Sequence, residues 1–90
     1  TKHLAANDLR ILRCDDAGKA IKVIEKTSVS VVVSAISIQP FDGLELLGRI
    51  RVQSPETLVI LTTGFPTTGQ IIEATQKGAH DVLRKESLSF

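Results

Sequence analysis

The chain has 90 residues, 42% of them hydrophobic and 23% charged, and its eleven Lys and Arg against ten Asp and Glu give a formal net charge of +1. This balance, with three Phe and no Trp or Tyr, excludes the charged or base-stacking surface that a nucleic-acid or anionic-membrane partner requires. No apolar run approaches the roughly 20 residues that cross a bilayer, and a lone Cys14, which has no internal disulfide partner, favours a cytoplasmic location.

Strand and helix patterns alternate along the first half of the chain. Residues 2–6 are typical of the end of a helix, and residues 9–14 predict a strand. Asp15 or Asp16 can cap the helix that follows. Residues 30–35 predict a second strand, apolar on both faces, as in a sheet that is covered on both sides. The buried face of the helix between them is predicted from helical spacing to be Ala17, Ala20, Ile21 and Ile24.

The second half continues the alternation. Asp42 and Glu45 form a capping-box pattern before a helix that ends at 54–57, and a strand follows over 58–62. Thr67 with Gln70 predicts a further cap, and Gly78 a helix stop before a short strand over 80–83. The inward residues are predicted to be Leu44, Leu46, Leu47 and Ile50 in the first of these helices, and Ile71, Ala74 and Thr75 in the second.

Repeated strand–helix units with short loops predict a single α/β domain over residues 1–90, with a parallel sheet and right-handed crossovers. The carboxyl ends of parallel strands meet at one edge, where ligand sites are usually built. A hydroxyl from Thr63 and the ammonium of Lys85 could there bind a phosphate or carboxylate. The alternative is that Thr63 caps a strand end and Lys85 is solvated. The other polar or small residues expected at this edge are Asp15, Asp16, Ser34, Ala35, Thr62, Gly64 and Arg84.

Five motifs, in order and at matching spacing, resemble the receiver domain of two-component response regulators, over about residues 9–85. That resemblance implies the flavodoxin-like (CheY-like) three-layer sandwich, here lacking its first strand and most of its last helix, so that the domain is incomplete. The motifs are DDAGKAIKVIEK (15–26), SVSVVVSA (28–35), FDGLELLGRIR (41–51), LVILTTG (58–64) and QKGAHDVLRK (76–85).

The resemblance also implies a chemistry that this chain lacks in part. Receivers accept a phosphoryl group from a histidine kinase on an aspartate, with Mg²⁺ held by carboxylates. Thr63 and Lys85 match the residues that contact the phosphoryl group, but the acceptor position, counted back from Asp42, falls on Ala35. Ser34 is expected on the opposite face of the strand. We therefore expect no catalytic residue, metal or cofactor, and no enzymatic activity.

The strand over 9–14 resembles the second strand of the family, with Asp15 and Asp16 at a helix start rather than in the family's acidic metal site. A first strand would then be absent from the middle of the sheet. Either the strand over 9–14 pairs directly with that over 30–35, or the gap is filled, by a partner chain as in a homodimer or domain swap, or by a segment that precedes Thr1. The last helix would barely begin at 87–90.

Two functions from different classes follow. The first is a degenerate receiver that acts through protein contacts, with a histidine kinase or an output domain as partner and Ile72, Gln76 and Val82 as contact candidates; for Ile72, core packing is the alternative. The second is a phosphorylatable, Mg²⁺-dependent receiver whose acceptor aspartate was replaced, or whose acceptor is Asp42. A third reading, a small enzyme that uses Cys14, lacks a neighbouring histidine to activate the thiol.

Overall fold

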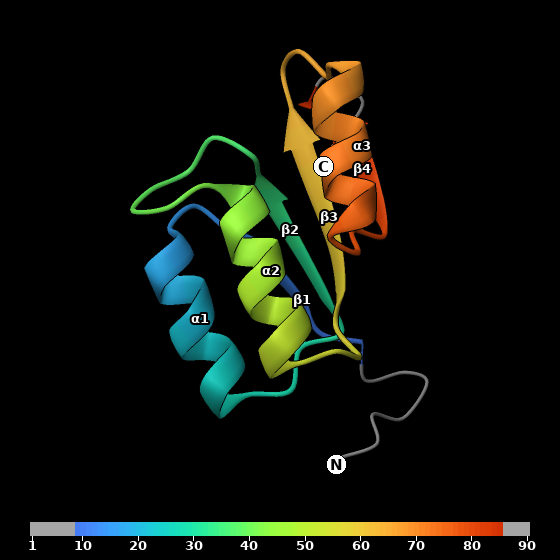
Figure 1. The fold of residues 1–90 in the computed structure, drawn as a ribbon. Coiled ribbons are helices and arrows are strands. Elements are labelled where there is room, and N and C mark those ends of the chain that lie inside the picture. The colour runs from blue at the N-terminus through green and yellow to red at the C-terminus, as the bar shows by residue number, and fades with distance from the viewer. Residues whose placement is uncertain (1–8, 86–90) are drawn as a thin grey trace.

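A computed structural model describes residues 9–85 of the chain, which form a parallel sheet with helices between its strands (Figure 1). The predicted helix end over 2–6 and helix start over 87–90 lie outside the described residues. Each of the predicted elements between them is present, with bounds shifted by one or two residues. The elements are β1 Ile11–Cys14, α1 Ala17–Lys26, β2 Val31–Ala35, α2 Gly43–Gln53, β3 Leu58–Thr63, α3 Thr68–Gln76 and β4 Asp81–Arg84.

The strands of this sheet are ordered β1-β2-β3-β4, and every neighbouring pair is parallel. Ile11 is paired with Val31, and Val31 with Leu58, so β1 lies directly beside β2 with no strand between them. Of the two arrangements that the sequence left open, direct pairing is therefore the one observed. It joins the backbone groups that a missing central strand would otherwise leave unpaired.

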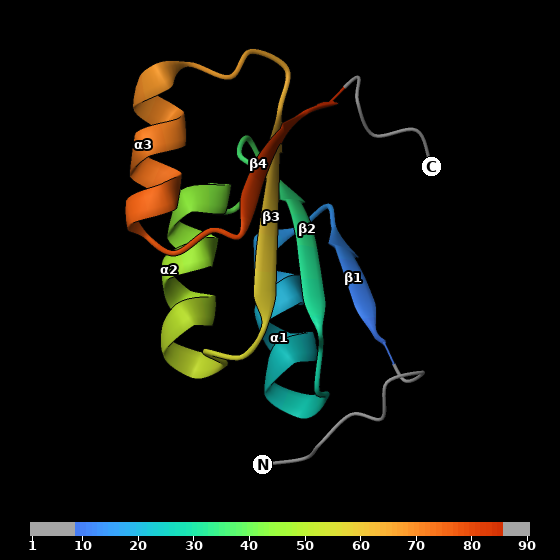
Figure 2. The same cartoon turned by 90° about the vertical axis from the view of Figure 1, so that its right-hand side faces the viewer.

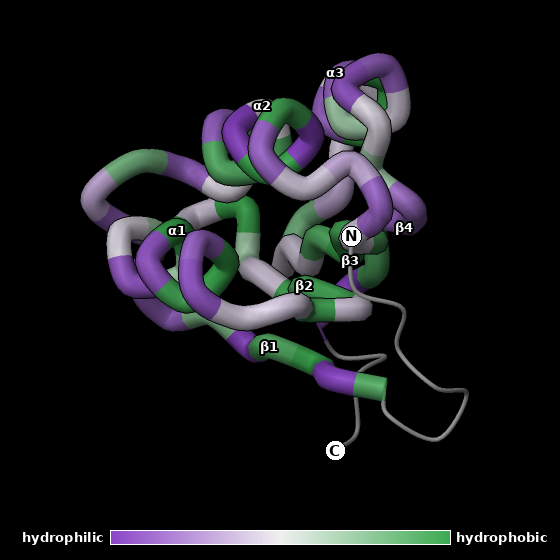
Figure 3. Tube along the Cα trace, turned by 90° about the horizontal axis from the view of Figure 1, so that it is seen from below, coloured by the Kyte–Doolittle hydropathy of each residue, from purple (hydrophilic) through white to green (hydrophobic). Residues whose placement is uncertain are grey.

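The helices α1, α2 and α3 all lie on the same side of the sheet (Figures 2 and 3). Successive strands are added in one direction, and right-handed crossovers then place every connecting helix on one face. The parallel α/β architecture is confirmed. Of the three expected layers, residues 9–85 build the sheet and one helical layer.

Side chains cap the helices at the residues that the sequence predicts. A carboxylate oxygen of Asp16 accepts a hydrogen bond from the Lys19 amide at 2.9 Å. The Thr67 hydroxyl accepts one from the Gln70 amide at 3.1 Å at the start of α3. Such a bond satisfies an amide that has no partner within the helix and is worth about 1 kcal/mol.

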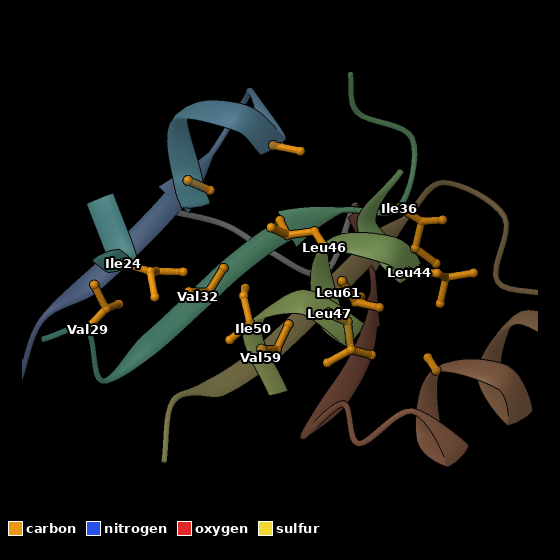
Figure 4. Packing of buried hydrophobic residues seen from close by; sticks show 13 residues of the cluster. Ile24, Val29, Val32, Ile36, Leu44, Leu46, Leu47, Ile50, Val59 and Leu61 are labelled. Atoms are coloured by element: carbon orange, nitrogen blue, oxygen red, sulfur yellow. The ribbon is translucent and has the colours of Figure 1, made fainter. Parts of the chain in front are cut away.

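The core fills the space between the sheet and its single helical layer (Figure 4). Leu46, Leu47 and Ile50 of α2 are completely buried, as predicted. The prediction for α3 is wrong in two places, since Ile71 is 41% exposed and Thr75 is exposed, and only Ala74 is buried. The reason is position: α3 lies at the end of the helical layer (Figure 1), where it meets only α2 and β4 closely. The remaining buried apolar residues are Ala17, Ala20, Ile24, Val29, Val32, Ile36, Leu44, Val59 and Leu61.

Candidate functional site at the carboxyl edge of the sheet

A pocket of about 380 Å³ opens where the strands end. Residues from all four described strand ends contribute to it, because parallel strands in register end at one edge. A pocket of this volume is large enough for a small molecule or a phosphoryl group. Its lining residues are Arg13, Cys14, Asp15, Val33, Ala35, Ser37, Ile38, Thr62 and Lys85.

Ala35 is the last residue of β2 and lines this pocket. The residue before it, Ser34, points to the helical side, is 1% exposed and donates its hydroxyl to the Ala35 carbonyl oxygen at 2.9 Å. This is the alternation expected of a strand. The position at which the resemblance puts a phosphoryl acceptor therefore faces the pocket, but its methyl group offers neither a nucleophile nor a metal ligand.

Asp42 is engaged elsewhere. It is the N-cap of α2, where its Oδ1 accepts a hydrogen bond from the Glu45 amide at 2.9 Å, and it does not line the pocket. The Glu45 carboxylate forms an ion pair with Arg49. Of the two hydrogen bonds of a capping box, the structure therefore shows one, from the Glu45 amide to the Asp42 carboxylate.

Of the two adjacent threonines, Thr62 rather than Thr63 lines the pocket. Thr62 is 5% exposed and is paired with Ala35 across the sheet. The Thr63 hydroxyl accepts a hydrogen bond from the Phe65 amide at 3.3 Å. This bond favours the reading in which Thr63 caps the end of its strand. The register of the strands decides which of the two threonines lines the pocket, and the spacing of the motif does not contain that register.

Asp15 is the pocket residue whose role the sequence reasoning missed. Because Cys14 is paired with Ser34, the next residues along both strands, Asp15 and Ala35, come to the same level at the sheet edge. The helix cap uses only Asp16. The sequence held a sign of this role, because two adjacent carboxylates cannot both cap one helix. It did not show which strand lies beside β1, and that strand decides what the second carboxylate faces. Lys85, which follows β4, lines the pocket as well.

The donor set of this pocket does not fit the Mg²⁺ that the family resemblance implies. Its lining includes one carboxylate, that of Asp15. Nowhere in residues 9–85 do three or more His, Cys, Asp or Glu side chains gather closely enough to hold a metal ion. With Ala35 in place of a carboxylate, the single Asp15 carboxylate stands beside two cations, Arg13 and Lys85, whose charge opposes the binding of Mg²⁺.

The charges of the pocket favour an anion over a cation. Arg13 and Lys85 bring two positive charges and Asp15 brings one negative charge. Burial, together with the nearby Asp15 carboxylate, raises the pKa of the Cys14 thiol to about 11. The thiol is therefore protonated near neutral pH, and it lacks the activation that a nucleophilic cysteine requires. This weighs against the enzyme reading based on Cys14.

The predicted contact residues differ in exposure. Ile72 is 51% exposed on α3, so the alternative of core packing is wrong for this residue. Gln76 is exposed on the same helix. Val82 of β4 is partly buried and packs against the core, so little of its side chain is accessible to a partner.

A second, larger hollow of about 690 Å³ lies on the helical side, lined by residues of α1 and α2 and by Lys77 at the end of α3. The Arg49 guanidinium on its wall pairs with Glu45 and stacks over the Phe41 ring, 4.1 Å from the ring centroid. Glu45 and Arg49 thus satisfy each other, and Lys77 forms an ion pair with Glu73 of α3. The lining residues are Ile21, Glu25, Glu45, Gly48, Arg49, Val52, Gln53 and Lys77.

The family model of the response regulator receiver domain matches residues 1–89. Among curated proteins, the response regulator protein FleR of Pseudomonas aeruginosa is 35% identical over 71 residues, which are 79% of this chain and 15% of FleR. The chemotaxis protein CheY of Listeria monocytogenes is 27% identical over 75 residues, 83% of this chain and 63% of CheY. The chain thus spans less than two thirds of these relatives.

Solved structures give the same result. The signal receiver domain of an HD domain-containing protein from Pseudomonas fluorescens superimposes with a TM-score of 0.82 and 26% identity, over 94% of this chain and 81% of that one. The beryllofluoride-activated NtrC4 receiver domain dimer gives 0.74 and 28% identity, over 80% of this chain and 60% of that one. Within residues 9–85, no helix has the length and apolar character needed to span a membrane.

Proposed function

Because the chain belongs to the response regulator receiver domain family of two-component signalling, we propose that it transmits its signal through protein contacts and is not itself phosphorylated. The observation that carries this proposal is the Ala35 methyl group in the pocket at the strand ends. Phosphoryl transfer to a receiver needs an attacking oxygen at that place. The nearest polar group in sequence, the Ser34 hydroxyl, is buried on the other face of the sheet.

Neither remaining carboxylate replaces the acceptor under this proposal. The Asp42 carboxylate is held in the cap of α2, outside the pocket. Asp15 lies in the pocket, but the cations Arg13 and Lys85 share the lining with this single carboxylate and oppose the binding of Mg²⁺. Without the metal, the charge that develops on a transferred phosphoryl group is not neutralised. The domain is proposed to have no enzymatic activity and to need no cofactor.

A histidine kinase or an output domain is the proposed kind of partner. The apolar side chain of Ile72 and the amide of Gln76 are accessible on α3 for such a contact. We also propose that the domain associates with a second copy of itself, since a related receiver was solved as a dimer. The unpaired Cys14 fits the reducing cytoplasm as its location.

Incubation with acetyl phosphate and Mg²⁺, followed by intact-mass measurement, tests the absence of phosphorylation. The expected result is an unchanged mass for the wild-type chain. The matched control is the Ala35→Asp variant, which is expected to gain one phosphoryl group because a carboxylate then faces Lys85 across the pocket. A phosphoryl adduct on the wild-type chain would overturn the proposal, and its loss in Asp15→Asn or Asp42→Asn would identify the acceptor.

A further inference from the structure

Thr62 brings a buried hydroxyl to the pocket at the strand ends. The residue is 5% exposed, lines that pocket, and makes no hydrogen bond through its side chain to any residue of the described part of the chain. Gln70 Oε1 is the side-chain polar atom that, within residues 9–85, is fully buried without a partner. The Thr62 hydroxyl is therefore not sealed in the core but reaches the pocket. Because a polar group in such a position usually has a partner, the hydroxyl is expected to bond to something that enters there.

The space in front of Thr62 exists because position 35 is an alanine. Thr62 and Ala35 are paired across the sheet, and both line the pocket. An aspartate at position 35 would place its carboxylate in this space, whereas the methyl group of Ala35 leaves it open. The pocket has a volume of about 380 Å³, so an ion of the size of phosphate has room beside the methyl group.

The charge of the lining selects the kind of ligand. Lys85 lines the pocket, is exposed and belongs to no ion pair within residues 9–85. Arg13 adds a second positive charge, and since it already takes part in another interaction it is not required as a contact. Asp15 brings the one negative charge of the lining. The uncompensated ammonium of Lys85 therefore favours an anion, with which it forms a charge-assisted hydrogen bond.

We propose that this pocket binds a small free oxyanion of the phosphate class without forming a covalent bond to it. This inference deepens the proposed function and rests on it, because the room for the anion is the room that a missing acceptor leaves. The Thr62 hydroxyl donates to one oxygen of the anion and the Lys85 ammonium to another. Ser37, in the loop after β2, lines the pocket with a second hydroxyl.

The proposed site differs from the one that the sequence predicts and from the chemistry that the family resemblance implies. The sequence predicts that Thr63 supplies the hydroxyl, but Thr63 does not line the pocket. The resemblance implies a phosphoryl group that is attached to an aspartate and is lost by hydrolysis. A free anion is lost by dissociation instead, so occupancy of the pocket would follow the concentration of the anion rather than the activity of a kinase.

Binding of the anion should stabilise the domain. Thr62 belongs to β3, Ser37 follows β2 and Lys85 follows β4, so an anion that contacts all three joins the ends of three strands. In the unfolded chain these residues are far apart along the sequence and form no site. A ligand that binds the folded state alone raises the melting temperature as its concentration increases.

The test is thermal unfolding and calorimetric titration of the 90-residue chain with inorganic phosphate, at an ionic strength kept constant with sodium chloride. The melting temperature is expected to rise with phosphate, and calorimetry to give one site for each chain. Sulfate, which carries the same tetrahedral set of oxygens, is expected to bind as well. Sodium chloride alone is expected to have no such effect. An unchanged intact mass in the same samples shows that the anion is held without a covalent bond.

Two adjacent threonines provide a matched pair of variants. Thr62→Val keeps the volume of the side chain and removes the hydroxyl, so Kd for phosphate is expected to rise about tenfold. Thr63→Val makes the same change one residue along, on the opposite face of the strand, and is expected to leave Kd unchanged. Lys85→Gln, at an exposed position, is also expected to weaken binding by about tenfold. Asp15→Asn removes a repelling charge and is expected to tighten binding several-fold.

Two outcomes would overturn the inference. If phosphate raised the melting temperature no more than sodium chloride does, the pocket would bind no such anion, and the proposed absence of phosphorylation would stand. If Thr63→Val weakened binding as much as Thr62→Val, the assignment of the hydroxyl to Thr62 would be wrong. A phosphoryl adduct formed from acetyl phosphate, in the experiment described above, would instead refute the proposed function. Circular dichroism of each variant establishes that it is folded.

Discussion

A Cβ atom at position 43 would lie 2.5 Å from the carbonyl oxygen of Ala35 and 2.9 Å from the Cα of Ile36. Gly43 opens α2, and its amide donates to the Ile36 carbonyl oxygen at 2.7 Å. The helix start therefore packs directly on the backbone that leaves β2. This contact fixes the loop after Ala35, and with it one wall of the pocket.

Replacement of Gly43 by alanine should destabilise the domain by about 1–3 kcal/mol, because the new methyl group meets backbone that cannot move aside. Gly48 in the same helix is the matched control, since a Cβ there has no neighbour within 4 Å. Gly48→Ala should stabilise by up to about 1 kcal/mol through helix propensity. Urea unfolding measures both. Equal effects of the same sign would contradict the close contact.

The Asp42 carboxylate is expected to act as a helix cap. Asp42→Ala removes the acceptor for the Glu45 amide and should cost about 1 kcal/mol of unfolding free energy. Asp42→Asn keeps an oxygen that can cap and should stay within a few tenths of a kcal/mol of the wild-type chain. Thermal or urea unfolding distinguishes the two. A loss as large for asparagine as for alanine would show that the charge matters rather than the cap.

An aspartate at position 35 should make the stability of the domain depend on magnesium. In Ala35→Asp two carboxylates, those of residues 15 and 35, would share the pocket and repel each other when no metal is present. Added Mg²⁺ should then raise the melting temperature of the variant, because a ligand that binds only the folded state stabilises it. The wild-type chain should not respond. A wild-type melting temperature that rises equally with Mg²⁺ would show a metal site independent of position 35.

Titration of the Cys14 thiol should lower stability at alkaline pH. Its pKa is raised from 9.0 to about 11 in the folded chain, so between these values the unfolded chain loses the proton while the folded chain keeps it. The unfolding free energy should fall as pH rises through this window, by the order of 1 kcal/mol after allowance for partial solvent screening. Urea unfolding at several pH values should show a shallower fall for Cys14→Ala. If the unfolding free energy fell equally steeply with pH in the wild-type chain and in Cys14→Ala, the raised pKa of Cys14 would be contradicted.

The element order and the caps could be read from sequence because their causes are local. Asp16 and Thr67 each bond an amide three residues away, and the apolar positions of α2 recur at helical spacing. The prediction failed for α3, where Ile71 is exposed. Its apolar pattern is compatible with a buried helix, but the burial of a helix depends on how many neighbours its layer provides.

The sequence by itself determined a parallel α/β domain of the receiver family with an alanine at the end of its second described strand. It did so because spacing, caps and motifs are properties of short segments. Only the tertiary structure decided that β1 lies beside β2, that Asp15 and Thr62 therefore share a pocket with Ala35, and that the described helices all cover one face. Strand pairing is made by backbone groups that every residue carries, so a strand's neighbour is not specified by its own residues.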